Sequence, residues 1–105
     1  MGIVFETGGA LHVRDTIVRK SSRGLEFFPI SGNPELYVSD SVFADSSGTG
    51  FDVKRGQVTL DRVRVENSAD NGMTFSTGSV AATVRDSVSS GNGLVGIRAD
   101  AGGGT

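Results

Sequence analysis

Acidic residues recur along the chain at one place relative to a short apolar-x-apolar motif. Asp15, Asp40 and Asp86 each lie two residues after a copy of this motif. Arg62 lies at the same place after a further copy. Glycoside hydrolases use paired carboxylates, one to protonate the leaving oxygen and one to act as base or nucleophile. If the protein is an enzyme, the catalytic candidates are therefore Asp40, Asp61 and Asp86.

A structural role explains the same aspartates better. Aspartate is frequent in tight turns, because its short side chain hydrogen-bonds nearby backbone N–H groups. An arginine at position 62, between Asp40 and Asp86, would also relieve the repulsion between stacked carboxylates. We therefore interpret this column as a turn position, and we expect a non-catalytic protein without a cofactor.

Aromatic side chains form a second candidate site. His12 and Tyr37 are the middle residues of two copies of the apolar-x-apolar motif. Thr59 and Thr83 are the middle residues of the other two, and all four would face solvent, because alternate residues of a strand point to opposite sides. Stacked rings there could contact a sugar, and ordinary solvent-facing strand residues are the alternative. For a binding module, the candidate carbohydrate surface is His12, Tyr37 and the nearby connection 28–35.

A polar cluster could bind a cation or stabilise the fold. It contains Asp45, Ser46, Asn67, Ser68 and Asn92. Amide and hydroxyl side chains stacked at one turn would hydrogen-bond along the fold, whereas a series of oxygen ligands suits Ca²⁺. The Gly-Gly-x-Gly-x-Asp repeat that binds calcium is absent from the sequence. We therefore favour a structural ladder and predict no metal site.

Two motifs recur in phase and predict the elements that would position these residues. The motif Gly-apolar-x-apolar begins at glycines that lie 22 to 26 residues apart, namely Gly2, Gly24, Gly50, Gly72 and Gly96. Both motifs alternate with period two, which is typical of short β-strands. Each repeat therefore predicts one coil of a solenoid, in which every strand pairs in parallel with its copy in the next coil. An antiparallel sandwich is the alternative, but it does not explain why the motifs recur in phase.

The third segment of each repeat is ambiguous. Ile17, Val42 and Val88 favour one set of inward positions. Val63 and Val65 favour the other set. Both registers stay open at this stage, because a shift by one residue turns every side chain to the opposite face.

The order apolar-x-apolar, Asp-Ser-apolar, Ser-Gly-x-Gly-apolar-x-apolar resembles the right-handed parallel β-helix repeats of the pectate-lyase-like superfamily, which include bacterial proteins without an assigned activity. The resemblance covers roughly residues 2–100. It implies an all-β fold, a right-handed single-stranded parallel β-helix of about four to five coils with 22–26 residues each. Residues 1–105 would form one such domain, as a segment of a longer repeat protein. The implied function is a structural or carbohydrate-binding module, and the alternative is a portion of a polysaccharide lyase or glycoside hydrolase.

Composition limits the partners. The net charge of -2 and the isoelectric point of about 5.2 provide no basic surface for nucleic acid or an anionic membrane. The chain has no cysteine, so no disulfide or thiolate metal site can form. No apolar run reaches about 18 residues, so we expect no membrane-spanning segment. None of these features indicates a compartment.

Two further expectations concern packing. We expect Gly50 to adopt a positive φ at the bend into its strand, a conformation that glycine adopts readily. The end coils would expose Ile3 and Phe5 on one side, and Val84, Leu94 and Ile97 on the other. Solenoids normally carry caps over such ends, and the sequence suggests none. We therefore expect a homo-oligomer that forms through the coil ends.

Overall fold

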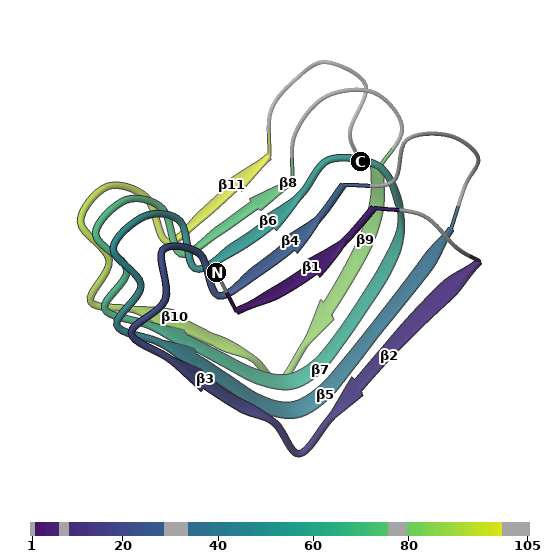
Figure 1. The fold of residues 1–105 in the computed structure, drawn as a ribbon, viewed down its shortest axis with the longest axis horizontal. Helices are drawn as coiled ribbons and strands as arrows, with labels where there is room; N and C mark the ends of the chain where they lie inside the picture. The colour runs from purple at the N-terminus through teal and green to yellow at the C-terminus, as the bar shows by residue number, and fades with distance from the viewer. Residues whose placement is uncertain (1, 7–8, 29–33, 76–79, 100–105) are drawn as a thin grey trace.

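The computed structural model describes residues 2–6, 9–28, 34–75 and 80–99, and within these ranges every regular element is a β-strand. They contain no helix that could cross a membrane. All pairings between the strands are parallel. Figure 1 shows the chain winding through successive coils that stack on one another.

One wall of the solenoid is a sheet of three-residue strands, which we call the short-strand sheet. Its order is β1 (Ile3–Phe5), β4 (Leu25–Phe27), β6 (Phe51–Val53), β8 (Met73–Phe75) and β11 (Ile97–Ala99). Each strand is the apolar-x-apolar part of one Gly-apolar-x-apolar motif. The pairing aligns the motifs residue by residue, as their constant phase in the sequence predicts.

The other two walls belong to a second sheet, which we call the long-strand sheet. It contains β2 (Ala10–Arg14), β3 (Ile17–Arg19), β5 (Glu35–Ala44), β7 (Gly56–Glu66), β9 (Val80–Arg85) and β10 (Val88–Ser90). Strands β5 and β7 continue through a corner, visible at the bottom of Figure 1, at which β2 and β9 end and β3 and β10 follow. The prediction of a parallel β-solenoid is confirmed, with about four turns.

The core is a set of apolar columns that run along the solenoid. Leu25, Phe51 and Met73 occupy equivalent positions on neighbouring strands and are completely buried. From the opposite sheet, the ring of Phe43 meets the ring of Phe51 edge-on, with 5.5 Å between the centroids. No single coil can bury such side chains by itself, so the stacking of coils supplies the hydrophobic stabilisation.

The structure settles the register of the third segment. Val63 and Val65 point inward and are 1% and 0% exposed, and Phe43 aligns with Val65. Ile17 and Val88 point outward and are 63% and 39% exposed. Val42 on the central strand β5 lies on the same outward side, where it is half-buried and aligns with the exposed Arg64. The register that Ile17, Val42 and Val88 suggest is therefore wrong.

The expectation of a positive φ at Gly50 is wrong. Among the described glycines, Gly56 and Gly91 have a positive φ and Gly50 does not. A Cβ atom at Gly50 would lie 2.5 Å from the Oγ of Ser68 and 2.6 Å from a methyl carbon of Val65. Glycine is required here because neighbouring atoms occupy the space of a side chain, not because of the backbone conformation.

Candidate functional site

The aspartate column lies at the corner of the long-strand sheet, in a left-handed backbone conformation. The angle φ is 48° at Asp15, 51° at Asp40, 55° at Arg62 and 48° at Asp86. Aspartate tolerates this conformation better than most residues, because its short polar side chain can hydrogen-bond locally. The structure therefore places the column at a turn that every coil repeats.

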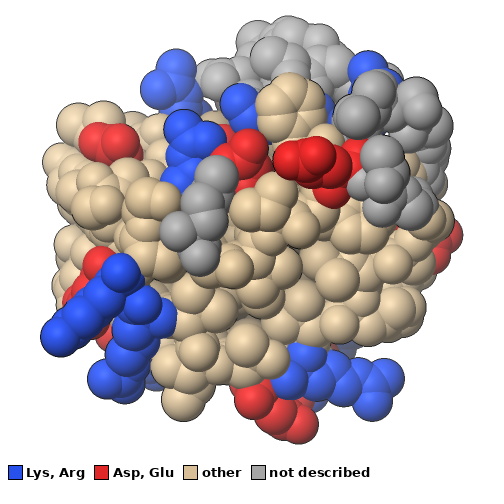
Figure 2. Space-filling model, viewed as in Figure 1, with Lys and Arg blue, Asp and Glu red and all other residues tan. Residues whose placement is uncertain are grey.

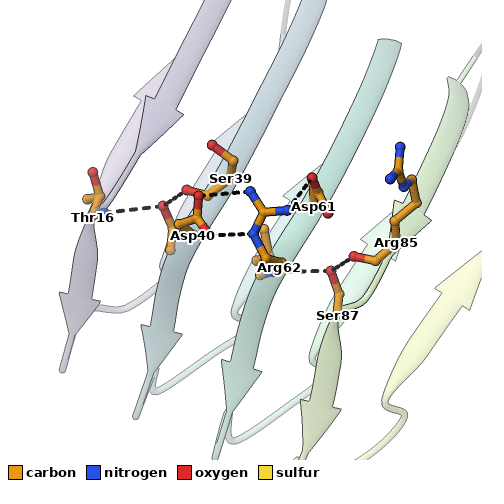
Figure 3. Close-up of polar contacts among 9 residues, drawn as sticks. Thr16, Ser39, Asp40, Asp61, Arg62, Arg85 and Ser87 are labelled. Atoms are coloured by element: carbon orange, nitrogen blue, oxygen red, sulfur yellow. Dashed lines mark hydrogen bonds and ion pairs between the residues drawn. The ribbon is translucent and has the colours of Figure 1, made fainter.

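Arg62 engages two of the three acidic residues that are the catalytic candidates. Its Nε and Nη2 atoms donate to the two carboxylate oxygens of Asp40 at 2.6 and 3.1 Å, and its Nη1 donates to Asp61 at 2.9 Å (Figure 3). The guanidinium holds the pKa of Asp40 below its ordinary value, first through the hydrogen bonds and then through its charge. In the described part of the chain, no hydrogen bond or ion pair joins Asp86 to Arg62, Asp40 or Asp61. The arrangement is an exposed ion-pair cluster.

The serine of the Asp-Ser motif has a structural task at the same corner. Ser41 Oγ accepts a hydrogen bond from the backbone N–H of Thr16 at 3.2 Å and donates to Ser39 O at 2.9 Å. At the same corner two coils further along, Ser87 Oγ accepts from the N–H of Val63 at 3.1 Å (Figure 3). These hydroxyl groups satisfy backbone groups where the chain bends.

The polar cluster lies at the next corner and is partly a ladder. Asp45 and Asn67 have φ values of 58° and 55°, and the Asn67 amide lies 3.5 Å from an Asp45 carboxylate oxygen. Asn92 accepts a hydrogen bond from the backbone N–H of Ser68 and donates one to Ser89, both at 3.0 Å. No group of three or more metal-binding side chains occurs among the described residues. The bonds from Asn67 to Asp45 and from Ser68 to Asn92 connect neighbouring coils, which is a structural role. The bond from Asn92 to Ser89 lies within one coil.

His12 and Tyr37 lie side by side on the outer face of the long-strand sheet, as their phase in the sequence predicts. Their rings stack with centroids 4.8 Å apart and planes 21° apart. Each ring therefore covers one face of the other. The Tyr37 hydroxyl donates to Glu35 at 2.6 Å, and this bond raises the pKa of Tyr37. Tyr37 has Thr59 of β7 as its neighbour on the other side, whereas His12 lies on the edge strand β2.

Next to Tyr37, the outer face of the long-strand sheet carries shorter side chains. Tyr37 aligns with Thr59 on β7, and Thr59 aligns with Thr83 on β9. An open hollow of about 430 Å³ lies there, lined by Gln57, Val58, Thr59, Ala81, Ala82 and Thr83. This volume is in the range of small-ligand sites. We call His12, Tyr37 and this hollow the aromatic step. The sequence predicts that the connection 28–35 contributes to the same surface, but its residues 29–33 lie outside the described residues.

A polar row that the sequence motifs do not reveal as a site lies on the outer face of the short-strand sheet. Glu26, Asp52 and Thr74 are the middle residues of β4, β6 and β8, and they align across the three strands. They point away from the core, yet they are only 9%, 7% and 9% exposed. We call these three residues the acidic row. Figure 2 shows acidic and basic side chains next to each other over this sheet, in the upper part of the view.

Two cations neutralise the acidic row. Arg23 donates to Glu26 at 2.7 Å, and the ammonium of Lys54 lies 3.8 Å from Asp52 Oδ2. Desolvation raises the pKa of Asp52 above its ordinary value, while Lys54 and Arg23 oppose this effect and Glu26 adds to it. The signal in the sequence was a charged residue in the middle of a Gly-apolar-x-apolar motif. It was not sufficient, because such a position is usually solvent-exposed.

The chain matches no family model, no curated protein and no solved structure. The function is therefore inferred from the chain's own residues.

Proposed function

We propose that the chain is a non-catalytic β-solenoid module that binds carbohydrate at the aromatic step. The observation that supports this most is the junction of an exposed aromatic pair with an open hollow on one rigid sheet. Aromatic rings supply a large contact area for an apolar sugar face. The flanking threonine hydroxyl groups can donate to and accept from sugar hydroxyl groups. The resemblance to pectate-lyase-like repeats agrees with a carbohydrate ligand.

The hydrolase alternative has less support in the geometry. Two of its candidate acids, Asp40 and Asp61, are already hydrogen-bonded to Arg62. An acid that must transfer a proton needs a free path to the substrate oxygen. Turnover of a glycan that disappears in Asp86→Asn or Asp40→Asn would favour the enzyme.

Binding to soluble glycans, for example xylan, pectin and a mixed-linkage glucan, tests the proposal by affinity electrophoresis. We expect retention of the wild-type protein by at least one glycan. We expect Tyr37→Ala to weaken that binding by up to about tenfold, since an aromatic contact contributes about 0.5–1.5 kcal/mol beyond its area.

Val88→Ala is the matched control, because Val88 and Tyr37 are both 39% exposed and Val88 lies on the other arm of the same sheet. Equal retention of the wild type, Tyr37→Ala and Val88→Ala would contradict a site at the aromatic step. So would the absence of retention by every glycan.

A further inference from the structure

Two polar atoms of the acidic row have no hydrogen-bond partner. They are Asp52 Oδ1 and Thr74 Oγ1, and neither finds a partner among the described residues. Both residues are more than nine-tenths buried and point to the same outer side. A buried polar atom without a partner destabilises a fold, so two neighbouring ones indicate a group that the protein is built to receive.

The spacing of the two strands that carry these residues suits one bridging oxygen. Asp52 and Thr74 are direct partners on adjacent parallel strands, which are about 4.8 Å apart. One oxygen that makes two hydrogen bonds of about 2.8 Å spans this distance. A hydroxyl group can donate to the carboxylate and accept from the threonine at the same time.

The charges around the row disfavour a metal ion. Glu26 is paired with Arg23 at 2.7 Å, and Lys54 faces Asp52. On β11, Arg98 aligns with Thr74 and adds a third cation beside the two carboxylates, so a divalent metal ion would be repelled. The Lys54–Asp52 distance of 3.8 Å is too long for a hydrogen bond. The ammonium therefore keeps donors for a second hydroxyl group.

An apolar ring borders the row. Phe28 is 47% exposed, and the ammonium of Lys54 lies 5.2 Å from the centroid of its ring. Aromatic rings beside paired hydroxyl-binding groups suit molecules with both hydroxyl groups and an apolar C–H face. Sugars have both features.

We propose that Asp52 and Thr74, with Lys54 and Phe28 at the rim, form a second ligand site that binds the vicinal hydroxyl groups of a sugar. This site lies on a different sheet from the aromatic step and does not depend on it. The two sites would let one solenoid contact a glycan on two faces.

The test is a titration of the isotope-labelled protein, followed by nuclear magnetic resonance. The probes are glucose, galactose, mannose, xylose and cellobiose, each at millimolar concentration, and calcium chloride in a separate series. We expect at least one sugar to shift the backbone amide signals of Asp52 and Thr74, and calcium to leave them unchanged. Thr74→Val and Asp52→Asn should each weaken this response about tenfold or more, because each removes a hydrogen bond to a buried or charged group.

Thr83→Val is the matched control, since Thr83 is exposed on the long-strand sheet. It should leave the response at Asp52 unchanged. The spectrum of each variant without ligand reports whether that variant is folded. If Thr74→Val does not fold, the conservative variant Thr74→Ser, which keeps a hydroxyl group, takes its place.

The proposal is overturned if no sugar shifts the signals of residues 52 and 74. A bound water would then be the partner of the two polar atoms. It is also overturned if calcium shifts them and the sugars do not. Tyr37→Ala separates the two proposals, because it removes glycan binding at the aromatic step and leaves the response at Asp52 intact.

Discussion

At position 52, a carboxylate lies on the outer face of β6 with 7% of the residue exposed and one oxygen without a partner. Burial raises the pKa of Asp52 above its ordinary 3.8. A raised pKa in the folded state means that the protonated form is favoured there. Stability from this group is therefore present below pH 3.8 and is lost as the pH rises through the raised pKa.

We predict that Asp52→Asn raises the free energy of unfolding at neutral pH by about 1–3 kcal/mol, because the amide removes a charge that burial disfavours. The gain should shrink in acid, where the wild-type carboxyl is protonated. Urea unfolding at acidic and neutral pH measures both values. A loss of stability at neutral pH would show that the pairing with Lys54 outweighs desolvation. If Asp52→Asn both raises the free energy of unfolding and weakens sugar binding, then Asp52 supports binding at a cost in stability.

The corner aspartates are predicted to act through the backbone. Asp86 has a φ of 48°, which glycine adopts without strain and a β-branched residue does not. Asp86→Gly should change the free energy of unfolding little, whereas Asp86→Val should lower it by about 1–3 kcal/mol. Thermal unfolding followed by circular dichroism distinguishes the two. An equal loss in both variants would assign the role to the carboxylate itself.

The types of single residues predicted the turn at the corner but not the burial of Asp52. The Asp-Ser dipeptide indicated a turn because aspartate and serine bond locally, and the structure has that turn at Asp40 and Ser41. Asp52 gave no comparable signal. The groups that shift its pKa include Arg23 and Glu26 of the neighbouring coil, and no local pattern contains that information.

At the scale of the elements, the repeat glycines are required because neighbouring coils lie too close for a side chain. A side chain at Gly50 would collide with Ser68 and Val65. We predict that Gly50→Ala lowers the free energy of unfolding by about 1–3 kcal/mol, as overpacking does. Gly9→Ala is the control, since a Cβ there has no neighbour within 4 Å. Equal urea midpoints for the two variants would show that the coils move apart at little cost.

The short strands were predictable because their motif alternates with period two and recurs in phase. The third segment was not, since Ile17 and Val88 are apolar and exposed at the outer coils. An apolar side chain at an outer coil costs little when it faces solvent. The register was therefore encoded by Val63, Val65 and Phe43 in the central coils, where burial is complete.

For the whole molecule, the two ends of the solenoid carry apolar side chains and open strand edges. Leu94 is 68% and Ile97 is 53% exposed. In the described ranges β1 and β11 each pair on one side only, and open parallel edges can receive a further strand.

We predict that the 105-residue chain associates end to end, so that its sedimentation coefficient rises with concentration. Ile97→Asn should reduce the association, because it removes apolar area from one end. Tyr37→Asn is a control on the outer face of the central strand β5, where Tyr37 is 39% exposed. A monomer at high micromolar concentration with a sharp, reversible melting transition would contradict end-to-end association.

The proposed carbohydrate surface is tested most directly by intermolecular nuclear Overhauser effects between a bound oligosaccharide and the labelled protein. Binding at the aromatic step predicts contacts from sugar protons to the ring of Tyr37 and to the methyl groups of Thr59 and Thr83. Contacts confined to the corner of Asp40 and Arg62, or none on the outer face of β5, β7 and β9, would contradict it.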